Sequence, residues 1–286
     1  MNRRSTKISA IVIAKNESVR IGECLNSLKW ADELIVVDNN SSDNTADIAK
    51  SNGAKVYSCI SSDFSQLRNF GKDKAHGEWL LYVDADEIVS NELTNEIREV
   101  ISHQDSPTTS SSCLTRGSSL KQILDPLFRG DDNRVGGYEI RRKNYYLGHA
   151  WRGDEYILRL MRGNALIEWF GKLHETARIK GKIGRLNNSL IHDTHRTLAE
   201  MVAKTNEWSA VEAKLRFDAG HPPIVWWRLL RVMWTGFSNS FFRQGGWRAG
   251  TVGWIESIYQ AFSMFITYAK LWERQQKSSK NEKSIY

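Results

Sequence analysis

The stretch from Leu80 to Ser90, LLYVDADEIVS, decides the fold and raises the first question about function. An apolar run leads directly into Asp84, Asp86 and Glu87. Continuous apolar runs of this length are typical of parallel strands buried on both faces of a sheet. Three carboxylates at the end of such a strand are costly to place unless something cationic lies beside them. The sequence therefore predicts a buried strand that ends at a cation.

The hundred residues around this stretch alternate between strand and helix patterns. Apolar or β-branched runs predict strands, and the segments between them carry helical spacing and helix-capping residues. The expected strands are 7–18, 33–38, 54–59 and 78–87, and the expected helices are 19–30, 44–53, 65–77 and 91–101. This alternation predicts an α/β fold with a doubly wound, mainly parallel sheet. Ligands of such sheets bind beyond the carboxyl ends of the strands, so we expect Asp38 to share one cleft with Asp84 and Asp86.

The rest of the chain divides by composition. The stretch 103–119 is rich in Ser and Thr and predicts a surface loop, whereas the short mixed runs between residues 136 and 181 predict antiparallel strands. The stretch 197–217 has a helical pattern. We expect a main domain over 1–220, with a nucleotide-binding half (1–102), a flexible loop (103–120) and an acceptor half (121–220), and a helical appendage over 221–286.

Composition limits the class of protein. The 286 residues are 41% hydrophobic, which is enough for a packed core, and the net charge of +7 suits an anionic partner such as a nucleotide, a nucleic acid or an acidic lipid surface. The three cysteines form no CxxC pair. They are interpreted as reduced thiols of a cytoplasmic protein.

The Asp-x-Asp pattern of Asp84 and Asp86 places two carboxylates close together at a strand end. Mg²⁺ and Mn²⁺ take oxygen ligands and commonly share their coordination with substrate phosphates. A lone Asp-x-Asp is weak evidence, because a solvated acidic turn has the same pattern. Asp38 at the end of another strand and Arg68-Asn69 in a basic helix strengthen the functional interpretation.

Several segments, in this order, resemble family 2 glycosyltransferases of the GT-A fold. They are ISAIVIAKNES, ADELIVVDNNSSDNT, SQLRNFGKDKAHGEWLLYVDADE, RRKNYYLG, LRLMR and LHE. The likeness extends to the branch that includes the lipopolysaccharide core β-glucosyltransferases of Gram-negative bacteria. It implies inverting sugar transfer, assisted by Mg²⁺ or Mn²⁺, from a nucleotide-sugar donor, expected to be a UDP-sugar, to a glycan or lipid-linked acceptor. No nucleic-acid partner is implied.

The resemblance also implies roles for individual residues. The donor nucleoside would contact Ala14, Asn16, Glu17 and Asp38, with Arg68 and Asp84 near the base or diphosphate. Asp84 and Asp86 would form the metal motif, with His192 as a further ligand. Glu175 of LHE would be the catalytic base, and the competing carboxylates are Asp154 and Glu155 of the GDE segment.

Each assignment has a structural alternative. Asp38 could cap a turn, Arg68 could be a solvated helix charge, and Glu175 could pair with Arg178 on a surface. The histidines of LIHDTH, His192 and His195, could be ordinary loop residues, and Asp193 could serve beside them.

The appendage combines tryptophan with arginine. Six of the eleven tryptophans lie between Trp226 and Trp272, and the longest charge-free run there, 257–269, is shorter than the roughly 20 residues of a spanning helix. Aromatic rings and cations together are typical of a membrane interface. We therefore expect a peripheral protein on an anionic membrane surface, at the inner face of the cytoplasmic membrane. A packed helical hairpin or a dimer contact is the alternative.

Two other functions fit parts of the pattern. VDADEIV loosely imitates the Asp-x-Asp of haloacid-dehalogenase-like phosphohydrolases, but that motif normally ends the first strand of its fold and here follows three strands. A non-catalytic, membrane-associated nucleotide-sugar-binding protein is the second alternative. The intact set of carboxylates argues against it.

Overall fold

The computed structural model describes residues 8–104, 134–151, 155–171, 175–195 and 197–283. By its internal contacts the chain divides into two compact units. The first unit consists of residues 1–142 and 155–192, and the second unit consists of residues 143–154 and 193–286.

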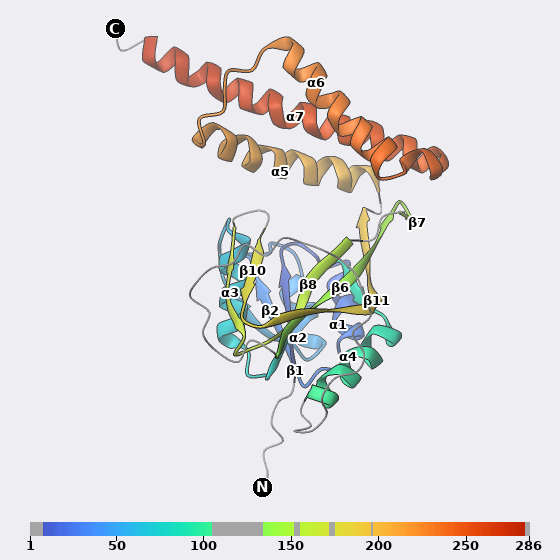
Figure 1. The fold of residues 1–286 in the computed structure, drawn as a ribbon. Helices are drawn as coiled ribbons and strands as arrows, with labels where there is room; N and C mark the ends of the chain where they lie inside the picture. Colours follow the sequence, from blue (N-terminus) through green and yellow to red (C-terminus); the bar gives the residue numbers. More distant parts are fainter. Residues whose placement is uncertain (1–7, 105–133, 152–154, 172–174, 196, 284–286) are drawn as a thin grey trace. The chain divides into compact units, whose positions relative to one another are not determined.

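The first half of the first unit is the predicted parallel sheet. Its strands lie in the order β3-β2-β1-β4, and every neighbouring pair runs parallel (Figure 1). The strands are β1 (Ile8–Ala14), β2 (Glu33–Asp38), β3 (Lys55–Ser58) and β4 (Trp79–Asp84). The helices are α1 (Ile21–Ser27), α2 (Thr45–Ser51), α3 (Phe64–Lys74) and α4 (Asn91–Gln104). The predicted α/β class, with a parallel sheet between helices and a C-terminal helical appendage, is confirmed.

The sheet continues with the strands that were expected to be antiparallel. Beyond β4 the order is β8-β6-β11-β5, and β8 runs antiparallel to β4. These strands are β5 (Glu87–Val89), β6 (Val135–Tyr146), β8 (Glu155–Arg162) and β11 (Lys182–His195), with β7 (His149–Ala150) beside β6. A separate two-stranded sheet contains β9 (Leu166–Phe170) and β10 (Thr176–Ile179).

Alternation along the strands builds a hydrophobic cluster on each face of the sheet. Val12 belongs to the cluster that contains the buried side chains of α1 and α4, whereas its neighbours Ile11 and Ile13 belong to the cluster with Leu67 of α3. The helix α3 lies close to the sheet because it carries a glycine there: a Cβ on Gly71 would be 2.6 Å from Ile11 Cγ2. Both faces of β1 are thus buried, as its continuous apolar sequence requires.

The second unit is built mainly of helices. Both α5 (Leu198–Asp218) and α6 (Trp226–Ser238) pack against the long helix α7 (Gly250–Lys283). A π-helical turn η1 (Asn239–Arg243) and a 3-10 turn η2 (Gly246–Arg248) connect α6 to α7. The sequence prediction placed residues 197–217 in the main domain, whereas α5 makes its contacts with α7. Within the part of the chain that the structure describes, no helix is both long enough and apolar enough to cross a membrane.

Candidate active site

The carboxyl ends of three parallel strands meet at one edge of the sheet. The register places Ala14 of β1 opposite Asp38 of β2, and Ile13 opposite Asp84 of β4. Asp38 and Asp84 therefore lie at the same edge of the sheet, and that they share one cleft with Asp86 stays a prediction. Asp86 and Glu87, the acidic residues that follow β4, come directly after the strand end at this edge.

The loops after β1 and β2 brace each other. Asn16 has a φ of 56°, an uncommon value that Asn tolerates better than most residues. Its Oδ1 accepts from the Ser42 backbone N–H at 2.8 Å, and its own N–H donates to Ser41 Oγ at 2.9 Å. The Glu17 N–H donates to Thr45 Oγ1 at 2.8 Å. These bonds fix the segment that the sequence assigns to the nucleoside.

Asp38 is buried, and its two carboxylate oxygens lie 3.4 and 3.3 Å from the Ser41 N–H. The turn-capping alternative for Asp38 therefore describes a contact that exists. Such a contact engages one face of the carboxylate and is compatible with a binding role, because an ionised carboxylate accepts about four hydrogen bonds.

Arg68 of α3 links Asp84 and Glu175, the two carboxylates for which the resemblance implies roles in metal binding and catalysis. Its Nη2 donates to Asp84 Oδ1 at 2.9 Å, and its Nε donates to Glu175 Oε1 at 2.8 Å. The residue is only 3% exposed, and its guanidinium carbon lies 4.8 Å from the centroid of the Trp169 ring. The alternative of a solvated helix charge is wrong for Arg68.

Asp84 is held by a second guanidinium group, that of Arg159. β8 runs antiparallel to β4 with Leu160 opposite Leu81, so Arg159 follows towards the carboxyl end of β4. Burial by itself raises the pKa of Asp84, but Arg159 and Arg68 outweigh it and hold this pKa well below its usual range. The sequence raised the question of what cation meets these carboxylates. For Asp84, the structure shows two arginines.

The ion pairs extend into a chain of alternating charges across the edge of the sheet. In order along the chain, the residues are Glu155, Arg142, Glu87, Arg159, Asp84, Arg68 and Glu175. Glu87 is fully buried, and burial raises its pKa above the usual range. The two described candidates for the catalytic base therefore stand at opposite ends of one ionic chain.

Sequence reasoning missed Arg142 and Arg159 as members of the site, although it placed Glu87 among the three carboxylates at the end of the strand. Their signal was present in the arginines of RRKNYYLG and LRLMR, which lie on strands where a buried charge needs a partner. Only the pairing of β8 with β4 and of Arg142 with Glu155 across β6 and β8 identifies those partners.

Asp86 lies in a different environment from Asp84. Its Oδ1 is 3.5 Å from His192 Nε2, and its Oδ2 is 3.5 Å from Arg20 Nη1. The register of β5 and β11 places His192 opposite Glu87, so the late histidine reaches the Asp-x-Asp by strand pairing. The two candidate metal ligands Asp86 and His192 are thus brought together.

These donors fit an ion that takes its other ligands from a substrate. Among the described residues, no group of three or more His, Cys, Asp and Glu side chains could hold a metal ion alone. Asp86 and His192 offer two donors, while both oxygens of Asp84 contact guanidinium groups. Mg²⁺ commonly uses one or two carboxylates and completes its octahedron with phosphates and water.

The remaining candidates are Asp154, His195, Asp193 and the suggested partner Arg178. Asp154 and the side chain of His195 are outside the described part of the chain. Arg178, the suggested surface partner of Glu175, pairs instead with Glu168 at 2.9 Å. Asp193 belongs to the second unit.

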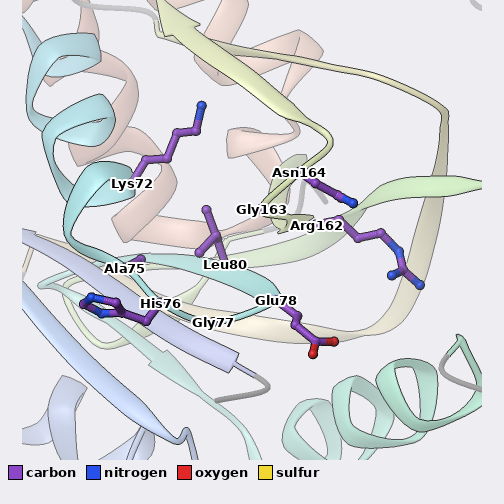
Figure 2. A pocket seen from close by; sticks show the side chains of 9 residues that line it. All are labelled: Lys72, Ala75, His76, Gly77, Glu78, Leu80, Arg162, Gly163 and Asn164. Carbon is purple, nitrogen blue, oxygen red and sulfur yellow. The ribbon is translucent and has the colours of Figure 1, made fainter. Parts of the chain in front are cut away.

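A pocket of about 390 Å³ lies at the opposite end of β4 from Asp84 (Figure 2). Its basic side chains are already engaged within the protein: Lys72 Nζ donates to the Ile167 carbonyl at 2.8 Å, and Arg162 lies over the Trp79 ring. Figure 2 shows Lys72, Arg162 and Glu78 pointing in different directions. The side chains that line this pocket therefore do not converge on a single position where a ligand could bind.

Comparison with known proteins identifies the relatives of this architecture. Residues 9–145 match the model of "Glycosyl transferase family 2". The "Lipopolysaccharide core biosynthesis glycosyltransferase LpsC" of Rhizobium meliloti is 25% identical over 288 residues, which cover 93% of this chain and 92% of LpsC. The glycosyltransferase SunS of Bacillus subtilis is 40% identical over 172 residues, which cover 59% of this chain and 34% of SunS.

Among solved structures, residues 1–349 of S. aureus TarS in complex with UDP-GlcNAc match with a TM-score of 0.41 and 16% identity, over 95% of this chain and 92% of that one. The sequence matches confirm the resemblance to family 2 glycosyltransferases and the prediction of a glycosyltransferase enzyme.

Proposed function

Since this chain is a glycosyltransferase with a family 2 domain over residues 9–145, we propose that it transfers a sugar with inversion from a nucleotide sugar, in the first place a UDP-sugar, to a glycan or lipid-linked acceptor. The similarity to a lipopolysaccharide core biosynthesis enzyme supports an acceptor in the lipopolysaccharide core. The observation that carries the proposal is the cluster of Asp84, Asp86, Arg68 and Glu175 beside the carboxyl ends of the parallel strands.

The loops after β1 and β2 bind the donor nucleoside in this proposal. Asn16 and Glu17 are held by hydrogen bonds between the two loops, and Asp38 contacts the Ser41 N–H of its own loop, which gives the nucleoside a preformed site. Ala14 ends β1 opposite Asp38. Ligands commonly bind at this position of a parallel sheet.

Asp86 and His192 would hold the divalent ion, and the ion would supply charge stabilisation for the departing diphosphate. Arg68 and Arg159 keep Asp84 anionic and fixed in orientation. We assign Asp84 to donor positioning beside the ion, with Asp86 as the direct carboxylate ligand.

Glu175 takes the proton from the acceptor hydroxyl as that oxygen attacks the sugar. A single displacement with inversion requires a base on the acceptor side and no covalent enzyme intermediate. The Glu175 side chain is 15% exposed and is fixed by Arg68, whereas the Glu155 side chain is 51% exposed and pairs with Arg142. The more enclosed carboxylate, connected directly to Asp84 through one arginine, is the better placed base.

The fold supports transfer over the two alternatives. The Asp-x-Asp follows β4, the fourth strand along the chain, and not the first strand as in haloacid-dehalogenase-like phosphohydrolases. A non-catalytic binding protein has no need for this chain of four carboxylates and three arginines, whose buried members are costly to assemble.

The test is release of nucleoside diphosphate from a panel of nucleotide sugars, with Mn²⁺, in the presence and absence of core oligosaccharide acceptors. Transfer predicts release that depends on acceptor. Release of inorganic phosphate would indicate a phosphohydrolase, and thermal stabilisation by a donor without turnover would indicate a binding protein.

We also propose that the second unit binds an anionic membrane surface from the cytoplasmic side. Trp226, Leu230 and Trp234 are spaced by four residues on one face of α6 and are 74%, 59% and 62% exposed. Between Asp218 and Glu256 the chain has four arginines and no acidic residue. Exposed rings beside unopposed cations suit a lipid headgroup layer better than water.

A further inference from the structure

The hairpin of β9 and β10 has no strand partner in the main sheet among the described residues. Thr176 of β10 pairs with Phe170 of β9, and Ala177 pairs with Trp169. Glu175, the proposed base, immediately precedes β10. Strand pairing with the main sheet therefore does not fix the position of Glu175 relative to the donor site.

One side chain of α3 takes the place of that missing strand partner. The Trp169 backbone N–H donates to Asn69 Oδ1 at 2.8 Å, and Asn69 Nδ2 donates to the Trp169 carbonyl at 2.8 Å. Both backbone groups of Trp169 are thereby satisfied by a single amide, as a neighbouring strand would satisfy them. A side-chain amide supplies a donor and an acceptor together, which a carboxylate, an ammonium or an alkyl group does not.

The Trp169 side chain also holds the hairpin in place, through contacts with β4 and α3. Its ring is 5% exposed and packs edge-on against Tyr82 of β4, with 4.9 Å between ring centroids. The guanidinium carbon of Arg68 lies 4.8 Å from the Trp169 ring centroid. Two adjacent residues of α3 therefore act on one hairpin: Arg68 binds the Glu175 carboxylate, and Asn69 binds the strand paired with the residues that follow it.

We propose that Asn69 is a positioning residue that holds the β9–β10 hairpin in register with the donor half, so that Glu175 reaches the acceptor hydroxyl. The inference rests on the proposed role of Glu175 as base. Asn69 acts only through the placement of the hairpin. A misplacement of about 1 Å at a reacting group can cost on the order of 10²-fold in rate.

The proposal predicts a selective kinetic defect. Asn69→Ala lowers kcat by about 10- to 100-fold. The KM for the nucleotide sugar changes by less than about threefold, because the proposed nucleoside contacts lie on the loops after β1 and β2. Asn69→Asp keeps the acceptor for the Trp169 N–H but sets a carboxylate oxygen against the Trp169 carbonyl, and it has the same type of defect.

Asn188→Ala is the matched control. Asn188 also makes a pair of hydrogen bonds to another element, through its N–H and its Nδ2, each at 2.8 Å from Glu96 Oε2. Its hydrogen-bond partners Glu92 and Glu96 lie on α4 and not on the hairpin. Its replacement is expected to leave kcat within about twofold of the wild type.

A double-mutant cycle separates positioning from a general loss of structure. With Glu175→Gln already present, Asn69→Ala is expected to lower the residual kcat by less than about threefold, because two residues that act as one unit are not additive. A full 10- to 100-fold loss in both backgrounds would overturn the proposal, as would an unchanged kcat for Asn69→Ala in a chain whose Glu175→Gln variant is slow.

Hydrogen exchange gives a readout that does not depend on turnover. Asn69→Ala is expected to speed amide exchange in residues 166–171 and 175–179 while the amides of β1 keep their protection. Unchanged amide exchange in the hairpin would refute the proposed role of Asn69 in holding the hairpin, even if Glu175→Gln proved fully active. If Glu175→Gln is fully active, its turnover refutes the assignment of Glu175 as the base. The hydrogen-exchange result then decides the role of Asn69 by itself.

Discussion

The two units differ in whether their arginines and aromatic side chains are buried or exposed. In the first unit, Arg68 and Arg159 are buried, and both pair with the carboxylate of Asp84. In the second unit, Arg231, Arg243 and Arg248 are exposed, and so are Trp226 and most of its neighbouring aromatic residues. Buried pairs of opposite charge suit precise orientation of a small anionic substrate. Exposed rings and unopposed arginines suit a broad surface that tolerates many orientations.

The two units are expected to differ in how strongly they respond to substitutions. Removing one member of a buried ionic chain leaves its partner uncompensated, which is costly and local in its effect. Removing one ring from a broad exposed surface subtracts only one contribution among several. We therefore expect large single-residue effects in the first unit and small, cumulative ones in the second.

The largest effect is expected from Asp86→Ala. The substitution removes the proposed carboxylate ligand of the ion, so the diphosphate loses its charge stabilisation and transfer falls below detection. Circular dichroism is expected to show a folded protein, because Asp86 is partly exposed and its contacts to His192 and Arg20 are long, at 3.5 Å. Full activity of the wild type in EDTA would contradict the metal requirement.

Glu175→Gln is expected to lower turnover by about 10²–10⁴-fold, because glutamine keeps the size of the side chain but cannot accept the proton. The donor KM is expected to stay close to that of the wild type, measured in steady-state kinetics at saturating acceptor. A near-wild-type Glu175→Gln beside an inactive Glu155→Gln or Asp154→Asn would move the base to the other end of the ionic chain.

A smaller effect is expected at the exposed surface of α6. The double variant Trp226→Ser with Trp234→Ser is expected to reduce partition onto liposomes that contain anionic lipid by about tenfold or more, since each ring contributes on the order of 1 kcal/mol or more. Flotation measures the bound fraction, and binding by the wild type is expected to weaken with salt.

The matched control for this experiment is Ile183→Ser, which replaces a similarly exposed apolar residue of the first unit. Liposome binding is expected to be unchanged in that variant. If the wild type does not float with liposomes but forms a dimer that the tryptophan variant loses, the surface is a contact between two copies of the chain.

The smallest effect concerns stability of the second unit. Glu256 of α7 is buried, and burial raises its pKa from 4.5 to about 7, opposed by a hydrogen bond from Gln260. Its neutral form is therefore favoured in the folded state. The resulting contribution to stability is fully present below about pH 4.5 and is lost as the pH rises through 7.

Thermal unfolding monitored at the tryptophans is thus expected to show a melting temperature a few degrees lower at pH 8 than at pH 5.5. Glu256→Gln is expected to flatten this dependence. An equal pH dependence in wild type and variant would assign it to other groups.

Sequence patterns predicted most of the first unit for a clear reason. The strands β1, β2 and β4 are buried on both faces, so each is a continuous apolar run, and the segments between them have helical spacing. The short strand β5 was not predicted. Its three residues follow the Asp-x-Asp, and only pairing with β11 makes them a strand.

The residues of the candidate site could likewise be predicted only in part. Asp38, Asp84 and Asp86 could be selected because they follow buried strands, where a carboxylate has few structural reasons to occur. Arg159 and Arg142 could not be selected, because an arginine on a mixed strand gives no indication of which acid it meets. The role proposed for Asn69 was hidden for the same reason: its partner Trp169 is 100 residues away in the chain.

The strand–helix alternation, the edge of the sheet where the carboxylates gather, and the aromatic and arginine-rich character of the appendage can all be predicted from the amino-acid sequence. These properties depend on local periodicity and on which residues follow each strand. Only the tertiary structure decided that two arginines hold Asp84, that His192 reaches Asp86, and that an asparagine ties the Glu175 hairpin to α3. It also decided that α5 packs with α7. Each of these contacts joins residues far apart in the chain, and the free energy of such a pairing depends on geometry that no local pattern contains.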